Sequence, residues 1–284
     1  MTVLVFGKTG QVAQALALHD TTLCLSRKEA DLARPECCAE AIRRIRPGAV
    51  INAAAYTTVD KAEQEETLAT TINAAAPAAM ATACAEQDIP FVTISTDYVF
   101  DGQGNTPHAP HATTAPLNAY GRSKLAGETR VAAAGGRWAV LRTSWVFAPG
   151  GANFATTMLR LSETRDSLSI VADQVGGPTP ASAIASACLT MAEALNRDQR
   201  KSGLYHFSGT PDVSWADFAR TIFDMAGRNC AVTDIPTAHY PTPARRPLNS
   251  RLDCSSLHAT FGIAQPDWRE ALPAVIETYR RTAK

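Results

Sequence analysis

Apolar and polar positions alternate with two different periods along the first half of the chain. Short apolar runs of strand length occur at Val3–Phe6, Thr22–Leu25, Ala49–Asn52, Phe91–Ser95 and Trp138–Arg142. The stretches between them are rich in Ala, and their apolar residues recur at helical spacing. Strands that alternate with helices are typical of a parallel sheet with helical crossover connections. The pattern therefore predicts an α/β fold.

The predicted helices fill the intervals between these strands and continue beyond them. The stretch from Asp60 to Gln87 is long enough for one extended helix or for two helices separated by a turn. The other helices are predicted at Gln11–Leu18, Pro35–Arg46, Asn118–Ala133, Asn153–Ser162, Pro180–Asn196, Trp215–Ala226 and Asp267–Arg281.

The regular rhythm ends near Gly150. We therefore expect a Rossmann-type doubly wound parallel sheet in residues 1–150, as a dinucleotide-binding domain. Residues 151–284 are expected to form a smaller, mainly substrate-binding C-terminal region, with some segments returning to the first domain. Between the fourth strand and the next helix, residues 102–116 contain three Pro and two His, a composition typical of a long loop. A long loop beside catalytic residues is often a substrate lid.

Composition excludes several classes of function. The 284 residues contain 27 Lys and Arg and 27 Asp and Glu, so no excess of positive charge predicts a nucleic-acid partner. No run approaches the roughly 18 apolar residues of a membrane span. The first residues lack a basic segment and lead directly into a glycine turn, which indicates a strand rather than a signal peptide. Seven cysteines without Cys-x-x-Cys spacing indicate reduced thiols and a cytoplasmic protein.

A glycine turn follows the first predicted strand with the spacing Gly7-x-x-Gly10-x-x-Ala13. Such a turn allows main-chain N–H groups to approach a pyrophosphate at the start of the next helix. Ala13 replaces the third glycine that lets helix and strand pack closely. The residues predicted to hold a dinucleotide here are Gly7, Lys8, Thr9, Gly10, Gln11 and Val12.

The end of the second strand indicates which dinucleotide is used. Ser26-Arg27-Lys28 places two cations and a hydroxyl where NAD-dependent enzymes tend to carry Asp or Glu. Arg27 is suited to the 2′-phosphate of NADPH. NADPH is therefore the predicted cofactor, with NADH as the alternative.

Tyr120 and Lys124 are four residues apart on a predicted helix and share one face. A nearby ammonium favours the phenolate, so we expect the pKa of Tyr120 to be lowered toward the working range. Tyr120 would then donate a proton to a carbonyl oxygen as hydride reaches the carbon, and Lys124 would hold the nicotinamide ribose. A hydroxyl from the Ser95-Thr96 pair would complete the site.

These motifs together resemble the extended short-chain dehydrogenases, and among them most closely the dTDP-4-dehydrorhamnose reductases. The resemblance is carried by Asn52–Tyr56, Ser95–Gly102, Tyr120 with Lys124, Arg142–Phe147, Asp173–Thr179 and Arg246–Ser250. It implies NADPH-dependent reduction of the C4 ketone of dTDP-4-dehydro-β-L-rhamnose, the last step of dTDP-L-rhamnose synthesis. The implied partner is a small nucleotide sugar, and a homodimer is left open.

The resemblance also implies a role for individual residues. Thr96, Tyr120 and Lys124 match the catalytic positions. The further cofactor contacts that it implies are Asp31 and Leu32 near adenine, and Ala53, Ala54, Ala55 and Tyr56. The implied substrate contacts are Thr96, Asp97, Tyr98, Trp145 and Arg246; for Arg246 a surface salt bridge is the alternative to a diphosphate contact. Ala15 stands where some members carry a Glu associated with Mg²⁺, so no metal is expected.

Two other readings of the sequence remain. A nucleotide-sugar dehydratase needs a second acid directly after the threonine and aspartate, but here Tyr98 follows Thr96-Asp97. Epimerases hold NAD tightly, which Arg27 and Lys28 do not favour. The alternative of a different class is a non-catalytic, NADP-binding regulatory subunit of the methionine adenosyltransferase type, because such proteins share this fold.

Overall fold

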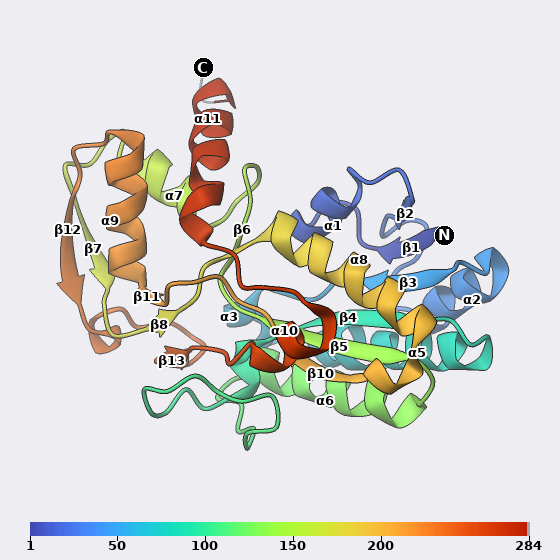
Figure 1. The fold of residues 1–284 in the computed structure, drawn as a ribbon. Helices are drawn as coiled ribbons and strands as arrows, with labels where there is room; N and C mark the ends of the chain where they lie inside the picture. The colour runs from blue at the N-terminus through green and yellow to red at the C-terminus, as the bar shows by residue number, and fades with distance from the viewer. Residues whose placement is uncertain (283–284) are drawn as a thin grey trace.

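A six-stranded parallel sheet forms the centre of the molecule (Figure 1), and the computed structural model describes residues 1–282. Its strands lie in the order β10-β5-β4-β3-β1-β2. They are β1 (Val3–Phe6), β2 (Thr22–Leu25), β3 (Ala49–Asn52), β4 (Phe91–Thr96), β5 (Trp138–Thr143) and β10 (Gly203–His206). The expected Rossmann-type α/β fold is confirmed, and β10 extends the sheet with a segment from beyond residue 200.

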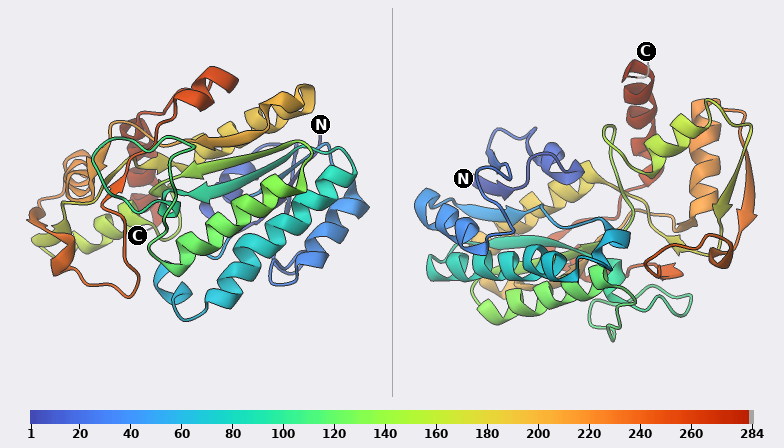
Figure 2. Two further views of the ribbon diagram at one scale, coloured as in Figure 1. Left: turned by 90° about the horizontal axis from the view of Figure 1, so that it is seen from below. Right: turned by 180° about the vertical axis from the view of Figure 1, so that it is seen from behind.

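Helices cover both faces of this sheet (Figures 1 and 2). One face carries α2 (Pro35–Ile45), α5 (Ala76–Glu86) and α6 (Ala119–Ala134), and the other carries α1 (Gln11–Leu16) and α8 (Ala181–Arg197). The alternation of β1 shows how the sequence divides the core: Val3 and Val5 pack on the α8 side, and Leu4 and Phe6 pack on the α2–α5 side. Because both faces are covered, the strands are apolar at consecutive positions, as expected for a buried parallel sheet.

Most helix bounds agree with the sequence patterns within a few residues. Helix α2 ends one residue early because Arg46 takes a positive φ of 51°. The Asp60–Gln87 stretch contains a short helix α3 (Val59–Ala62), then α4 (Glu66–Thr70), a π-helical turn η1 (Thr71–Ala75) and α5. The continuous run from Glu66 to Glu86 is long and apolar enough to cross a membrane by composition alone. It packs against α2 and α6 on the sheet, so it is a core helix.

A second group of elements packs around a separate core beside the sheet (Figure 1). Its helices are α7 (Phe154–Leu161), α9 (Trp215–Ala226) and α11 (Leu272–Thr282). Its strands are β6 (Val146–Phe147), β7 (Ser167–Val171), β8 (Val175–Gly176), β9 (Thr179–Pro180), β11 (Val213–Ser214), β12 (Ala231–Ile235) and β13 (Asn249–Ser250). The chain also returns to the main sheet through α8, β10 and α10 (Ser255–Phe261).

The long loop at residues 102–116 follows strand β4 and leads into α6. Its backbone is bonded at its start and near its middle: the Gly102 carbonyl accepts from Asn249 N–H at 3.0 Å, and His108 N–H donates to the Arg251 carbonyl at 2.9 Å. Among the described residues, no member of this loop lines the cleft of about 530 Å³ at the carboxyl ends of β1, β3, β4 and β5. The loop is therefore anchored to the C-terminal segment, and its role as a lid stays a prediction.

Candidate active site

A cleft of about 530 Å³ lies at the carboxyl ends of β1, β3, β4 and β5. This is the edge where open α/β sheets place ligands, because the strand order reverses there. The side chains and main-chain segments that line it come from the glycine turn, the loops after β3 and β4, helix α6 and the segment after β5. They include Thr9, Gly10, Gln11, Val12, Ala53, Ala54, Ala55, Thr96, Asp97, Tyr98, Tyr120, Lys124 and Trp145, all predicted from the sequence.

The glycine turn is closely packed. Gly7 has a φ of +115°, and a Cβ there would lie 3.3 Å from the Ala13 Cβ and 3.4 Å from the Ala53 backbone. Ala13 therefore fills the space that a third glycine would leave open. Gln11 opens helix α1, and its Oε1 accepts a hydrogen bond from Asn153 Nδ2 at 3.1 Å. The turn is thus tied to the segment before α7 on the other side of the cleft.

The remaining predicted cofactor residues lie outside the cleft lining. Arg27 is highly exposed and pairs with Asp31 at 3.4 Å, four residues along the chain. Leu32 is buried in the core under α2. The Tyr56 hydroxyl donates to Glu65 at 2.7 Å, and its ring packs against Ala62, Ala69 and Ala119 rather than lining the cleft.

The catalytic triad predicted from the sequence is brought together by β4 and α6. Asn118 caps α6 by accepting the Gly121 N–H at 2.8 Å, which fixes the first turn carrying Tyr120. Lys124 Nζ donates to the Ile94 carbonyl at 2.6 Å. Thr96 Oγ1 accepts from Tyr98 N–H at 3.2 Å and donates to Asp97 Oδ1 at 3.1 Å.

Burial controls the protonation of these groups. It raises the pKa of Tyr120 to about 12, a hydrogen bond with Thr96 opposes the rise, and Asp97 adds to it. The expected lowering of the Tyr120 pKa is therefore wrong for this structure, because loss of solvation outweighs the Thr96 hydrogen bond. Burial lowers the pKa of Lys124 to about 8. It also raises the pKa of Asp97 to about 6, and one oxygen of this carboxyl, Oδ2, is buried without a hydrogen-bond partner.

A second cavity, of about 720 Å³, adjoins the cleft, since Tyr98 and Trp215 line both. Arg246 lines this second cavity and forms a bidentate pair with Asp60, at 3.1 and 2.9 Å. Arg246 thus forms a salt bridge, which was the expected alternative to a diphosphate contact, and its side chain also lines the cavity. Its lining is otherwise mostly apolar and aromatic, with Phe154, Met158, Leu161 and Tyr240.

Two stacked tryptophans stand where the cavities meet. Trp145 has a positive φ of 49°, which is rare for a residue with a side chain, and its ring stacks on Trp215 with centroids 3.5 Å apart. Trp215 Nε1 donates to Gln174 Oε1 at 3.2 Å. A Cβ at Gly176 would lie 3.1 Å from the Trp145 ring, so a glycine there leaves room for the indole.

The RmlD substrate binding domain model matches residues 1–281. The chain belongs to this family, that of the dTDP-4-dehydrorhamnose reductases. A dTDP-4-dehydrorhamnose reductase of Sinorhizobium fredii is 45% identical over 283 residues, covering 95% of each chain. The Escherichia coli K12 reductase is 41% identical and covers 100% of both chains.

Solved structures of the reductase family agree with this assignment. A dTDP-4-dehydrorhamnose reductase from Clostridium acetobutylicum superposes with a TM-score of 0.91 at 34% identity, covering 99% of this chain and 100% of that one. The Bacillus anthracis reductase in complex with NADP has a TM-score of 0.89 at 34% identity, covering 98% and 99%. The family resemblance read from the motifs is thereby confirmed.

Several residues lining the reductase cleft were not found by sequence reasoning. They are Gln14, Asn52, Thr57, Val59, Ile94, Thr143, Ser144, Val146, Gly151, Ala152 and Trp215. For Asn52 and Thr143 the sequence did hold a signal, because each stands at the end of an apolar strand whose carboxyl edge carries the site. No sequence signal indicated a role for Trp215, which was predicted only as the first residue of a helix.

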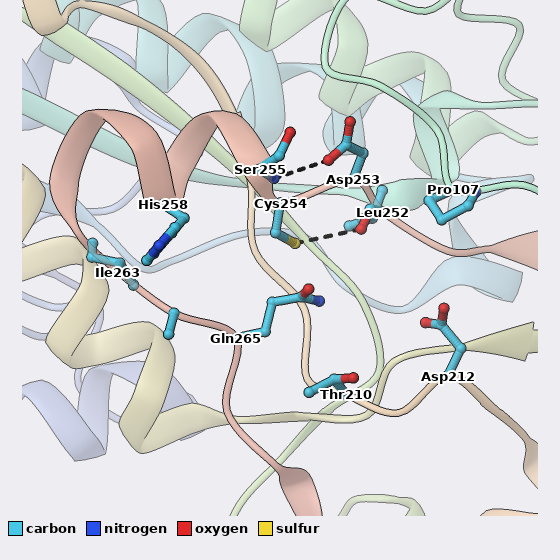
Figure 3. Close-up of a pocket in the computed structure, with 11 residues that line it drawn as sticks. Pro107, Thr210, Asp212, Leu252, Asp253, Cys254, Ser255, His258, Ile263 and Gln265 are labelled. Carbon is cyan, nitrogen blue, oxygen red and sulfur yellow. Dashed lines mark hydrogen bonds between the residues drawn. The ribbon is translucent and has the colours of Figure 1, made fainter.

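Figure 3 shows a third cavity, of about 630 Å³. It shares no lining residue with the other two cavities, within the described part of the chain. Its charged groups include Asp212 and Asp253, and Asp253 accepts the Ser255 N–H at 2.9 Å. Carboxylates do not favour a nucleotide diphosphate, so the cleft and the second cavity remain the candidate site. In residues 1–282, no group of three or more His, Cys, Asp or Glu is arranged to hold a metal ion.

Proposed function

We propose that the protein reduces the C4 ketone of dTDP-4-dehydro-β-L-rhamnose with NADPH, giving dTDP-β-L-rhamnose as the last step of dTDP-L-rhamnose synthesis. One observation carries this proposal: Thr96, Tyr120 and Lys124 meet in a cleft that adjoins a second, larger cavity. A reductase of this substrate must hold both a dinucleotide and a nucleotide sugar, and the two adjoining cavities provide the space.

The residues of the glycine turn suit the cofactor. Gly7 has a positive φ, and Ala13 and Ala53 lie close to it, so a side chain at this position would fill the space where the main chain can approach a phosphate. Bound NADPH supplies the hydride. We assign the pyrophosphate to the turn from Gly7 to Val12, the 2′-phosphate to Arg27, and the nicotinamide ribose to Lys124.

Tyr120 acts as the proton donor in this scheme. With its pKa raised to about 12, the phenol stays protonated at neutral pH, which is the form that reduction requires. As hydride adds to the sugar C4, the Tyr120 hydroxyl gives its proton to the C4 oxygen, so that the ketone becomes the alcohol. The Thr96 hydroxyl, which donates to Asp97 in this structure, turns its proton to the same oxygen, and the Lys124 ammonium stabilises the phenolate that results.

The second cavity is proposed to hold the nucleotide diphosphate, with Tyr98 and Trp145 against the deoxysugar. Two arginines, Arg165 and Arg246, line this cavity, and Arg246 is three quarters buried and already held by Asp60. In this assignment residues 1–150 hold mainly the cofactor, and residues 151–284 contribute mainly substrate contacts. The free state of all seven cysteines supports a cytoplasmic location. A homodimer stays a prediction, tested by the mass of the protein in solution.

The function is tested by NADPH oxidation. Purified protein is supplied with dTDP-4-dehydro-6-deoxyglucose and the 3,5-epimerase that converts it, and the loss of NADPH absorbance is followed. We expect a loss that depends on the epimerase. If protein that binds NADPH oxidises neither NADPH nor NADH, the reductase proposal is wrong and the regulatory-subunit reading is favoured.

The cofactor preference is tested at Arg27. Arg27→Ala should raise the KM for NADPH roughly tenfold, the effect of losing one charge-assisted hydrogen bond, and leave the KM for NADH nearly unchanged. Arg44→Ala is the matched control, because it removes the same charge from an exposed position on α2. Equal effects on the two cofactors would contradict a role of Arg27 at the 2′-phosphate.

A further inference from the structure

A fully buried ion pair lies directly behind the catalytic residues. Arg142 on β5 donates to the Glu128 carboxylate from Nε at 2.9 Å and from Nη2 at 2.6 Å, and the two side chains are only 2% and 4% exposed. Neither residue lines the cleft. A buried pair of this kind adds little net stability over an apolar pair, so its presence calls for another explanation.

Glu128 is connected to the catalytic groups through two paths. Glu128 lies one helical turn of α6 after Lys124 and two turns after Tyr120, so the three residues share one face of the helix. Its carboxylate also accepts a hydrogen bond from Ser95 Oγ at 2.5 Å, and Ser95 directly precedes the catalytic Thr96. The carboxylate therefore joins α6 to the end of β4, where the reacting groups meet.

Arg142 holds the loop that joins these same two elements. Its Nη1 donates to the Pro110 carbonyl at 2.9 Å and lies 3.3 Å from His206 Nε2. His206 Nδ1 lies 3.0 Å from the His108 carbonyl, so this nitrogen carries the proton and Nε2 accepts from the arginine. Burial and the Arg142 charge lower the pKa of His206 to about 3, which keeps the ring neutral.

We propose that the Glu128–Arg142 ion pair positions the catalytic residues of the reductase. Glu128 keeps the Lys124 ammonium charged, and Arg142 fixes the loop between the catalytic strand and the catalytic helix. This inference rests on the proposed function.

The charge balance around Lys124 explains why a carboxylate is needed. Burial lowers the pKa of this lysine, and Glu128 opposes that effect. The other ionisable groups of the surrounding elements are Tyr120 on α6, Asp97 and Tyr98 after β4, and Arg142 on β5. On the neighbouring α3, Asp60 is held by Arg246 and Lys61 by Glu65, and on α4 Glu66 is held by Arg122 near the surface. Glu128 is thus the carboxylate whose charge offsets the burial of Lys124.

Two single substitutions separate this role from simple packing. The protonated lysine is the active form, so activity is lost as pH rises through its pKa. Glu128→Gln removes the negative charge and leaves Arg142 uncompensated, so the alkaline limb of kcat/KM should move down by about one pH unit. Arg142→Gln leaves the carboxylate uncompensated beside Lys124, so the alkaline limb should move up. If the pair had a purely structural role, both variants would lose activity or stability, but the alkaline limbs of their pH profiles would not move in opposite directions.

Further variants keep the test decisive if either single substitution prevents folding. Glu128→Asp retains the charge and should keep the wild-type position of the limb even if the rate falls. The double variant Glu128→Gln/Arg142→Gln removes both charges and should shift the limb down relative to Glu128→Asp. Identical limbs in these two proteins would overturn the proposal.

A second readout does not depend on turnover. The affinity for NADPH is measured against pH by fluorescence, because Lys124 is assigned to the nicotinamide ribose. The pH at which binding weakens should shift in the same directions as the kinetic limb. An inactive wild-type protein would count against the proposed reductase function, whereas an unshifted binding profile in all variants would count against the positioning role alone.

Discussion

Tyr120→Phe is expected to lower kcat by about 10²–10⁴-fold while leaving NADPH binding intact, because it removes only the hydroxyl that gives the proton. The ring should keep its place, since it packs edge-on against Tyr98 with centroids 5.7 Å apart. The measurement is NADPH oxidation in the epimerase-coupled assay, together with NADPH affinity by fluorescence.

Tyr205→Phe is the matched control for this experiment. The Tyr205 hydroxyl donates to the Lys201 carbonyl at 2.8 Å, and the residue does not line the cleft. We expect its activity to remain close to that of the wild type. If Tyr120→Phe kept more than about a tenth of the wild-type kcat, proton donation by this phenol would have to be abandoned.

The central sheet could be predicted from the sequence because each strand is buried on both faces. Four consecutive apolar residues between helical stretches, as in Val3–Phe6, have few other interpretations. The bounds of β2, β3 and α9 were predicted residue for residue. Strand β12 was missed because it is largely exposed, so its sequence has no apolar run that distinguishes it from a loop. The two-residue strands are too short to carry a pattern.

The candidate site could be predicted where local motifs carry it and not where distant segments meet. Tyr120 and Lys124 share a helical face, which sequence spacing alone indicates. The bond between Arg246 and Asp60 joins residues 186 positions apart, and that between Arg142 and Glu128 joins β5 to α6. No local pattern specifies such pairs. The raised pKa of Tyr120 was missed for the same reason, since burial is a property of the assembled fold.

The contacts of helix α6 explain why the catalytic geometry depends on its close approach to the end of β4. Gly121, directly after the catalytic tyrosine, faces the main chain of Tyr98: a Cβ at this glycine would lie 2.2 Å from the Tyr98 carbonyl oxygen and 2.9 Å from the Pro116 Cβ. A backbone atom cannot move aside as a side-chain end can. An added methyl group must therefore push the helix away from β4 or distort the segment after it.

Gly121→Ala should lower kcat/KM by about 10²-fold, because a displacement of about 1 Å between reacting groups has an effect of this size. Overpacking should also reduce the free energy of unfolding by about 1–3 kcal/mol. Both are measurable, by the coupled assay and by urea unfolding. Gly150→Ala is the matched control, since a Cβ there has no neighbour within 4 Å. Wild-type activity and stability in Gly121→Ala would mean that Tyr120 does not depend on this contact for its position. A large loss of activity with a small loss of stability would instead show that the contact serves the placement of Tyr120 and Tyr98 more than it serves the fold.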